Sequence, residues 1–463
     1  MKRRIWLFIA IIAVVSILTV SIISCINVVD GDVVDVFYNN LVSTGSVFDI
    51  RSPYMDVDWG SYNHYKAGLH MHTTNSDGSN TMEEMLARHY ELDYDIVGIT
   101  DHVWKGTEGR RQRMNLVTRT PTQTTWTGPG DYPRPVGTYT TQLSYITQAR
   151  VNEFAAGTAV TPGLSTPRGR GMVILPGSAE FALEVGGEEM NVFFFNGNAP
   201  PGWSTNLRGG IQIAHNAGAV FFINHPGRTT VAMNYPEEGS AGNGQGANSP
   251  SNPSNENRWI RKYADLFMEF PITSLAGLEV FNRRDQDSRH DRVLWDNVLT
   301  RVIPHGRFVW GFGNDDAHST SPTSTSGGIN TNYNVFVMPS NTTSNFRNAM
   351  VNGQFYVVTV VGFNEGVDIL TASTVTRPSI TSITFGENDD TITISAKDVS
   401  NITWISEGQV ILTDTGTENE GIRTFTIDLA DSAHVDDVGV YVRANLIGPG
   451  GMALIQPIAT TRR

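Results

Sequence analysis

Between about residues 66 and 360, short apolar runs rich in β-formers alternate with helical patterns, and this alternation constrains the fold most strongly. Strands that alternate with helices build sheets covered by helices. The predicted strands are Ala67–His72, Asp95–Thr100, Met172–Pro176, Asn191–Phe195, Ala219–Asn224, Gly277–Phe281 and Phe308–Gly313. The predicted helices are Met82–Leu92, capped by Asn80 or Thr81, and Leu207–Asn216, Arg289–Val302 and Thr343–Val351. The pattern predicts an α/β fold of the (β/α) barrel type.

The pattern changes after residue 371, where polar residues alternate with β-branched or aromatic ones and turns recur every few residues. That alternation predicts a small antiparallel β-sandwich over residues 371–463. Residues 26–65 are interpreted as a lead-in segment and residues 66–365 as the barrel. Three segments rich in small and polar residues, 105–140, 235–257 and 319–332, are predicted to be loops.

The N-terminus is typical of an export signal. A basic stretch at residues 2–4 precedes an apolar run from Ile5 to Ile23, and the only cysteine, Cys25, follows directly. This arrangement resembles a bacterial lipobox, with residues 1–25 as signal and Cys25 as the lipidated residue. The alternative is an uncleaved transmembrane anchor, since the run approaches the roughly 20 residues that span a bilayer. Both interpretations predict a membrane-tethered, extracytoplasmic protein.

The composition argues against some binding partners and against one source of stability. The net charge of −13 argues against nucleic acid, whose phosphates require a basic surface. A single cysteine excludes an internal disulfide, so stability must come from packed cores and metals.

The run GLHMHTTNSDG places His70 and His72 two residues apart at the end of a predicted strand. Side chains alternate along a strand, so both imidazoles point to one face and can bind one transition metal. Asp77 adds an oxygen ligand in the turn that follows. A pair of histidines at this spacing is also typical of an exposed strand. Whether His70 and His72 bind a metal therefore depends on whether the chain supplies further ligands.

Further candidate ligands follow other predicted strands. They are Asp101 and His102 in ITDH, Glu180 in LPGSAE, His225 in NHPG, Glu279 and Asn282 in LEVFN, and Asp316 and His318 in NDDAH. A single residue of this kind often serves as a cap or turn former. Together they would meet at the carboxyl-end rim of one barrel, where active sites lie. Without metal, so many clustered carboxylates and imidazoles would be costly through repulsion and desolvation, so the set predicts a metal centre.

These motifs, in this order, resemble the PHP (polymerase and histidinol phosphatase) family over roughly residues 66–320. The LEVFN and NDDAH blocks look most like its carbaryl-hydrolase-like branch. The resemblance implies a distorted (β/α)7 barrel with two or three divalent metal ions, usually zinc, manganese or iron. The implied ligands are His70, His72, Asp77, His102, Glu180, His225, Asp316 and His318.

One position departs from the family pattern. A histidine is expected at the start of the strand after Glu180, but Met190 and Asn191 stand there. Asn191 is retained as a candidate ligand, although its carbonyl oxygen is a weaker zinc ligand than imidazole. The third metal is therefore lost, weakly held or changed in identity.

Two metals about 3.5–4 Å apart activate a bridging water and neutralise developing negative charge. In the interpretation that the resemblance supports, His70, His72, Glu180 and Asp316 hold the buried pair, and Glu180 bridges it. Asp101 is predicted to orient a ligand imidazole. Arg284, with Arg283 and Arg228 nearby, is predicted to bind the substrate anion, although any one of them is equally typical of a solvated surface.

The leading hypothesis is a metal-dependent phosphoesterase that cleaves a phosphorylated small-molecule ester outside the cytoplasm. A carboxyl- or carbamate-ester hydrolase is the alternative among hydrolases, because a metal centre of this kind serves both kinds of ester. A third hypothesis is a surface binding lipoprotein with a catalytically silent barrel. The departure at Asn191 favours that third possibility.

Overall fold

A computed structural model describes most of the chain beyond residue 45. The described residues are 40–41, 46–103, 123–128, 137–142, 144–182, 188–196, 206–227, 258–284, 289–322, 324, 327–362, 365–368, 375–386 and 390–463. The predicted signal with Cys25, Arg228 and the predicted loop 235–257 lie outside them. Among the helices of this described part, none has both the length and the apolarity to cross a membrane.

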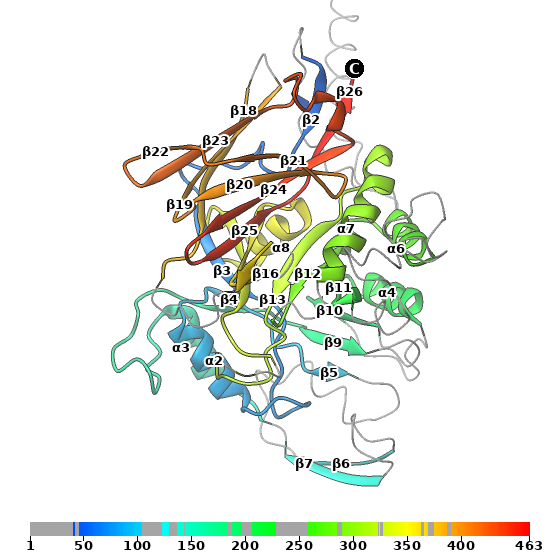
Figure 1. Ribbon diagram of the computed structural model, residues 1–463. Helices are drawn as coiled ribbons and strands as arrows, with labels where there is room; N and C mark the ends of the chain where they lie inside the picture. The colour runs from blue at the N-terminus through cyan, green and yellow to red at the C-terminus, as the bar shows by residue number, and fades with distance from the viewer. Residues whose placement is uncertain are drawn as a thin grey trace, which may run out of the picture. The chain divides into compact units, whose positions relative to one another are not determined.

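A six-stranded sheet carries much of the predicted barrel, in the order β13-β12-β11-β10-β9-β5 (Figure 1). Its strands are β5 (His102–Val103), β9 (Ala179–Ala182), β10 (Glu189–Phe193), β11 (Val220–Asn224), β12 (Leu275–Asn282) and β13 (Trp310–Asn314). Strand β10 runs antiparallel to both β9 and β11, whereas the other neighbours are parallel. The amino end of β10 therefore lies at the same edge as the carboxyl ends of β11 and β12.

The remaining barrel strands belong to a larger sheet of twelve strands. Along its main path the order is β1-β2-β26-β24-β25-β15-β14-β3-β4-β8, and β20 and β21 extend it beside β24. The N-terminal strands are β1 (Asn40–Leu41), β2 (Phe48–Arg51), β3 (Asn63–Gly68), β4 (Ile96–Val97) and β8 (Val173–Ile174). The others are β14 (Asn332–Met338), β15 (Phe355–Thr359), β20 (Asn401–Ser406), β21 (Gln409–Asp414), β24 (Tyr441–Gly448), β25 (Gly451–Ile455) and β26 (Ile458–Arg462).

The mixed α/β fold is confirmed, but the predicted barrel strands form two sheets and not one closed ring. Within the described residues, a single parallel bridge between Met71 and Ala317 joins the end of the β3 segment to the end of the β13 segment. Strands β4 and β8 pair over only two residues each, so the ladder ends before it can close. A (β/α)7 barrel is therefore not seen as one continuous hydrogen-bonded sheet.

The predicted helices are present with nearly the predicted bounds. They are α2 (Met82–Glu91), α4 (Leu207–Asn216), α7 (Arg289–Val302) and α8 (Thr343–Asn352), accompanied by α3 (Gln148–Ala156), α6 (Arg258–Glu269) and the 3₁₀ turn η2 (Ile303–His305). Thr81 is the N-cap of α2 and forms a capping box with Glu84. Helix α4 packs on β11, and α7 packs on β12. These helices cover apolar strands, as alternation of strands and helices predicts.

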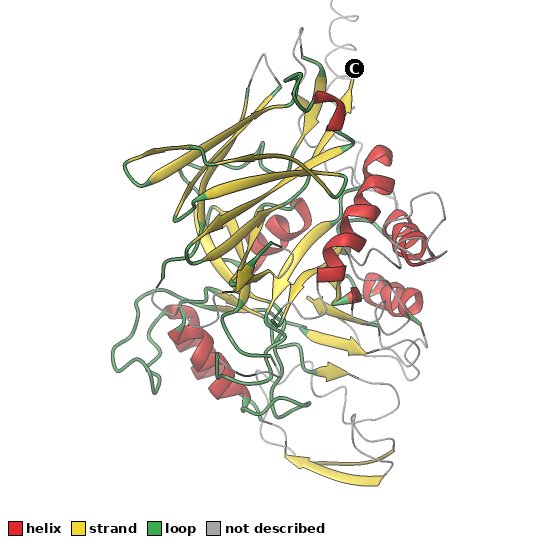
Figure 2. Ribbon diagram, viewed as in Figure 1, coloured by secondary structure: helices red, strands yellow, loops and turns green. Residues whose placement is uncertain are grey.

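The C-terminal part is built almost wholly of strands (Figure 2). Strands β18 (Ser379–Phe385), β19 (Thr391–Lys397), β23 (Ile422–Asp428) and β22 (Thr417–Asn419) form a four-stranded antiparallel sheet, and η3 (Val435–Asp437) is a short 3₁₀ turn. Two hairpins, β6 (Gln123–Gly128) with β7 (Gly137–Gln142) and β16 (Val361–Gly362) with β17 (Val367–Asp368), form two-stranded ladders of their own. Strand β25 pairs with β15, so the large sheet continues across the predicted 365/371 boundary. The domain limits stay a prediction.

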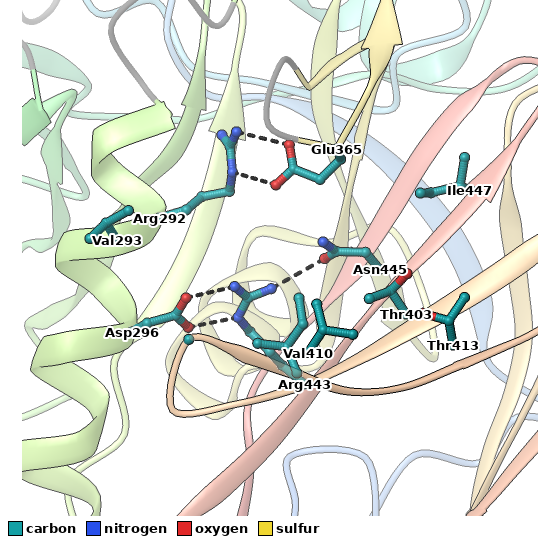
Figure 3. A pocket seen from close by; sticks show the side chains of 12 residues that line it. Arg292, Val293, Asp296, Glu365, Thr403, Val410, Thr413, Arg443, Asn445 and Ile447 are labelled. Carbon is teal, nitrogen blue, oxygen red and sulfur yellow. Dashed lines mark hydrogen bonds and ion pairs between the residues drawn. The ribbon is translucent and has the colours of Figure 1, made fainter. Parts of the chain in front are cut away.

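Buried ion pairs tie α7 to the C-terminal strands around a cavity of ≈ 320 Å³ (Figure 3). Arg443 on β24 donates through Nε and Nη2 to the two carboxylate oxygens of Asp296, at 2.8 and 2.7 Å. Tyr441 donates its hydroxyl to the same carboxylate at 2.7 Å. Nearby, Arg292 forms a second bidentate pair with Glu365. Such geometry fixes how the helix meets the strands.

Removing one member of the Asp296–Arg443 pair is expected to destabilise the fold strongly. Asp296→Ala leaves a buried guanidinium uncompensated, which costs about 3–5 kcal/mol of unfolding free energy. The quantity is measured by urea denaturation of the purified chain. The exposed pair of Arg462 with Asp436 supplies the control, because Arg462→Ala is expected to change stability by less than about 0.5 kcal/mol. Equal effects of both variants would contradict a structural role for the buried pair.

Candidate metal centre

The extended segment around Met71 positions the first candidate ligands. His72 donates its backbone N–H to the Ala317 carbonyl at 2.8 Å, and the Ala317 N–H donates to the His70 carbonyl at 3.2 Å. Side chains alternate along extended chain, so the residues that flank Met71 and Ala317 face the same side. His70 and His72 thereby meet Asp316 and His318. The predicted HxH geometry is present, although β3 itself ends at Gly68.

The innermost group combines two imidazoles and two carboxylates. His70 Nε2 lies 3.2 Å from Glu180 Oε1 and 3.3 Å from Asp316 Oδ1. His72 Nε2 lies 3.2 Å from Glu180 Oε2 and 3.1 Å from Asp316 Oδ1. The two oxygens of Glu180 thus face different histidines, which is the arrangement that a bridging carboxylate requires.

A second group is rich in nitrogen and opens to solvent. It consists of His72, Asp77, His102 and His318, with donor atoms within 4.8 Å of one another. Asp77 Oδ2 lies 3.1 Å from His318 Nε2 and 3.6 Å from His102 Nε2. The Asp77 side chain is 34% exposed, whereas the three imidazoles are buried. Asp77 therefore marks the side on which the cluster is open to solvent.

A third group is rich in oxygen and contains a residue that the sequence interpretation missed. Glu189, the first residue of β10, lies with Oε2 3.3 Å from His225 Nε2 and Oε1 3.6 Å from His102 Nδ1. Glu180 Oε1 lies 3.7 Å from the same nitrogen of His225. The signal was present in the sequence as the acidic residue two positions before Asn191.

The structure does not bring Asn191 into any of these groups, so its assignment as a ligand is corrected. Asn191 points to the same face of β10 as Glu189 but lies deeper, with no exposed surface. Its side-chain N–H₂ donates to the Leu69 carbonyl at 3.0 Å, and its carbonyl oxygen accepts from Asn224 at 2.9 Å. Asn224 also donates to Glu180 at 2.6 Å. Asn191 acts through Asn224 on the position of Glu180.

The chemistry of the cluster fits divalent metal ions. Five imidazoles and four carboxylates surround one space, and all but Asp77 and Glu189 are at most 8% exposed. Within the described residues, His70 Nε2, His72 Nε2 and Glu180 Oε2 are buried and form close ion-pair contacts with one another but no hydrogen bond of good geometry. Native proteins rarely leave such atoms unsatisfied, and a coordinated cation would satisfy them.

The electrostatics of the cluster also call for positive charge. Burial opposes an imidazolium, yet the carboxylates, Asp316 first, hold the pKa of His70 well above its ordinary value. The pKa of His102 is raised to about 10 against the same burial, mainly by Glu180. Burial and neighbouring imidazoles lower the pKa of His72 to about 4. Protons thus balance the carboxylates in the metal-free cluster, and metal ions would displace them.

Glu279 supports the metal centre from behind, as a partner of ligands. Its Oε1 accepts from His70 Nδ1 at 2.8 Å, and its Oε2 accepts from the backbone N–H of His225 at 2.9 Å. Asn282 and Asn314 donate to the same carboxylate at 3.0 and 2.8 Å. A carboxylate on the far nitrogen of a ligand imidazole fixes its tautomer and raises its basicity.

Within the described residues, Asp101 bonds to the turn after His72 and to no ligand imidazole, in contrast to its predicted role. Its carboxylate accepts from the backbone N–H and hydroxyl of Thr73 and from the hydroxyl of Ser76, each at 2.7 Å. The Ser76 hydroxyl lies 3.4 Å from His72 Nδ1. Asp101 therefore holds the turn that contains Asp77. In the sequence, the hydroxyl residues Thr73 and Ser76 next to His72 indicated donors for such a carboxylate.

Of the predicted arginines, Arg283 contacts the cluster directly. Arg283 Nε donates to Asp316 Oδ2 at 2.7 Å, while its side chain remains 31% exposed. The Arg284 side chain is half-buried. The predicted role of Arg284 in binding an anion stays a prediction.

Backbone strain gathers at the same place. Three residues with side chains have a positive φ here, His225 at 24°, Arg283 at 49° and Asp316 at 47°. Conformations of this kind cost about 1–3 kcal/mol each and cluster at functional sites. The fold holds these side chains in positions that the local sequence would not choose.

The chain is similar to a solved structure, but only at low sequence identity. No protein-family model and no curated protein matches the chain. A two-domain protein from Bacteroides vulgatus, described as containing a predicted PHP-like metal-dependent phosphoesterase, is similar at 12% identity over 89% of this chain and 90% of that chain, with a TM-score of 0.39. This similarity is too low to support a functional argument, which must come from the site.

Glu279→Gln is expected to weaken metal binding about 10–100-fold, because the amide is a poorer acceptor for His70. Affinity is measured by competition with a chromophoric chelator. Glu153→Gln, on the exposed face of α3, is the matched control and should leave affinity unchanged. Unchanged affinity in Glu279→Gln would show that this carboxylate only holds the backbone.

Proposed function

We propose that the chain is a metal-dependent hydrolase whose substrate is a phosphate ester. The convergence of four carboxylates and five imidazoles carries this proposal, because buried donor atoms that lack hydrogen bonds are arranged around one space. Divalent metals bound there would lower the pKa of a coordinated water and neutralise charge that develops on an ester oxygen.

The chain's own residues supply the remaining functions. Glu180 presents an oxygen to each of two imidazoles and so sets the spacing of the centre. Glu279 and Asp101 fix the ligands and the turn beside them. Arg283, held by Asp316, has guanidinium N–H groups beyond Nε with which to bind a phosphoryl oxygen.

Charge balance favours a phosphate over a neutral ester if three metals bind. Two divalent ions neutralise the four carboxylates, whereas a third leaves a surplus that matches a phosphomonoester dianion. Arg283 adds one further positive charge at the solvent side. With two metals only the charge of Arg283 is left over, which favours a dianion less, so carboxyl and carbamate esters are tested beside the phosphate esters.

Membrane tethering through Cys25 and an extracytoplasmic location are part of the proposal. They are supported by the basic and apolar sequence of residues 1–25. Nucleic acid is not proposed as a partner because the net charge is −13.

Hydrolysis is expected to require metal and His70. The full chain, kept in mild detergent because of its apolar N-terminus, is assayed on aryl phosphate, phosphodiester and carboxyl-ester substrates. A chelator should abolish turnover, Mn²⁺ or Zn²⁺ should restore it, and His70→Ala should reduce kcat at least 100-fold. Activity on carboxyl esters alone would refute the phosphoesterase proposal. Fewer than two metals per chain, with no effect of His70→Ala, would favour a binding protein.

Arg283→Ala is expected to lower kcat/KM for phosphate esters about 10–100-fold, the loss of one charged hydrogen bond of about 1.5–3 kcal/mol. Arg284→Ala, the matched variant on the neighbouring residue, should have a smaller effect. The measurement is steady-state kinetics on phosphate and carboxyl esters, with metal content checked in each variant. A larger effect of Arg284→Ala would restore the assignment made from the sequence.

A further inference from the structure

Glu189 gives the centre two kinds of metal pocket within one cluster. The pocket formed by His72, Asp77, His102 and His318 offers three imidazoles and one carboxylate. On the other side, the carboxylates of Glu180 and Glu189 face His225. His102 borders both pockets, because its Nδ1 lies 3.0 Å from Glu180 and 3.6 Å from Glu189. The inner group of His70, His72 and Asp316 lies between them.

The position of Glu189 follows from strand direction. Strand β10 is reversed between β9 and β11, and Glu189 pairs with Asn224 on β11, directly before His225. The first side chain of β10 is therefore delivered to the edge where β11 ends. The Glu189 side chain is 18% exposed, whereas the Glu180 side chain is 1% exposed. The pocket therefore has a buried wall at Glu180 and a solvent-exposed wall at Glu189.

The buried wall is formed by Glu180, whose two carboxylate oxygens both border the centre. Glu180 Oε1 lies 3.7 Å from His225 Nε2. Glu180 Oε2 is buried and makes no well-aligned hydrogen bond within the described residues, with His102 Nδ1 at 3.0 Å and His72 Nε2 at 3.2 Å. A carboxylate with no exposed surface and an unsatisfied oxygen is costly unless a cation lies beside it.

Ligand type then separates the two pockets. Imidazole-rich sites suit zinc, whereas carboxylate and water ligands suit harder ions such as manganese. Raw affinity for zinc exceeds that for manganese at most protein sites, so the ligand set shifts the ratio between the two metals. The carboxylate of Glu189 should shift this ratio toward manganese at its own pocket more than at the imidazole-rich pocket, with which it shares only His102.

We propose that the centre is built for two different metals, with the Glu180–Glu189–His225 pocket selective for a hard divalent ion of the Mn²⁺ type and the His72–His102–His318–Asp77 pocket selective for Zn²⁺. This inference rests on the metal-dependent function proposed above. It goes further by assigning a metal preference to each pocket and by making Glu189 the residue that determines it.

The test follows metal displacement and not activity. The full chain is loaded with Mn²⁺ and titrated with Zn²⁺, and the released Mn²⁺ is followed by electron paramagnetic resonance. In the native chain, one Mn²⁺ per chain should resist displacement to a Zn²⁺ concentration at least tenfold above that which releases the others. In Glu189→His this resistant ion should be released with the others, while total zinc capacity is kept.

Two further variants keep the test decisive. Glu189→Gln removes the charge with little change in shape, so it should lose the resistant Mn²⁺ even if the histidine variant folds poorly, and thermal melting reports folding in each. Glu153→His adds an exposed histidine on α3 and should reproduce the native curve. Identical displacement curves for the native chain and both Glu189 variants would overturn the proposal. Absence of hydrolysis with a normal displacement pattern would instead count against the proposed function alone.

Discussion

The pairing of residues 70–72 with residues 316–318 is the constraint on which the site depends. Between these segments a single bridge, at Met71 and Ala317, joins two sheets that form separate strand ladders in the described part of the chain. Met71 also bonds to Thr100 through both its N–H and its carbonyl, at 3.0 and 2.9 Å. The Met71 backbone is therefore fixed between the segments that contain Thr100 and Ala317. His102 and Asp316, which follow and precede these residues, lie beside it as a result. Gly327 shows how closely this region packs, because a Cβ there would lie 2.0 Å from the Asp316 carbonyl oxygen.

Much of the cluster could be predicted from the sequence because its ligands follow strand ends. His102, Glu180 and His225 each lie at or beside an apolar strand, and strand ends at one edge of a sheet meet in space. Glu189 could not be predicted in this way, because β10 is antiparallel to its neighbours and Glu189 lies at its amino end. Hydrophobic alternation reveals which face a residue occupies but not the direction of its strand. Asn191 was chosen on the correct face, two residues too far along the strand.

Supporting carboxylates were harder to tell from ligands, since both kinds follow strands. Asp315 and Asp316 are adjacent, yet only Asp316 faces the imidazoles. Asp315 accepts three backbone N–H groups, from Asn330, Thr331 and Asn332, at 2.6 to 2.7 Å. Burial raises the pKa of Asp315 to about 6 in spite of those bonds. The sequence shows two carboxylates, and only the fold shows that one of them secures the chain that leads into β14.

The apolar core of the six-stranded sheet contains aromatic contacts that involve none of the charged residues of the cluster. Phe222 and Phe312 stack at 4.4 Å between centroids in the six-stranded sheet, with Phe355 at 4.8 Å beyond. These contacts contain no ligand and do not depend on a cation. The buried carboxylates Glu180 on β9 and Glu279 on β12 lie in strands that are paired on both sides, whereas Asp316 lies beside the bridge at Ala317. Apolar burial in the sheets therefore stabilises the framework that holds the strained conformations of His225 and Asp316.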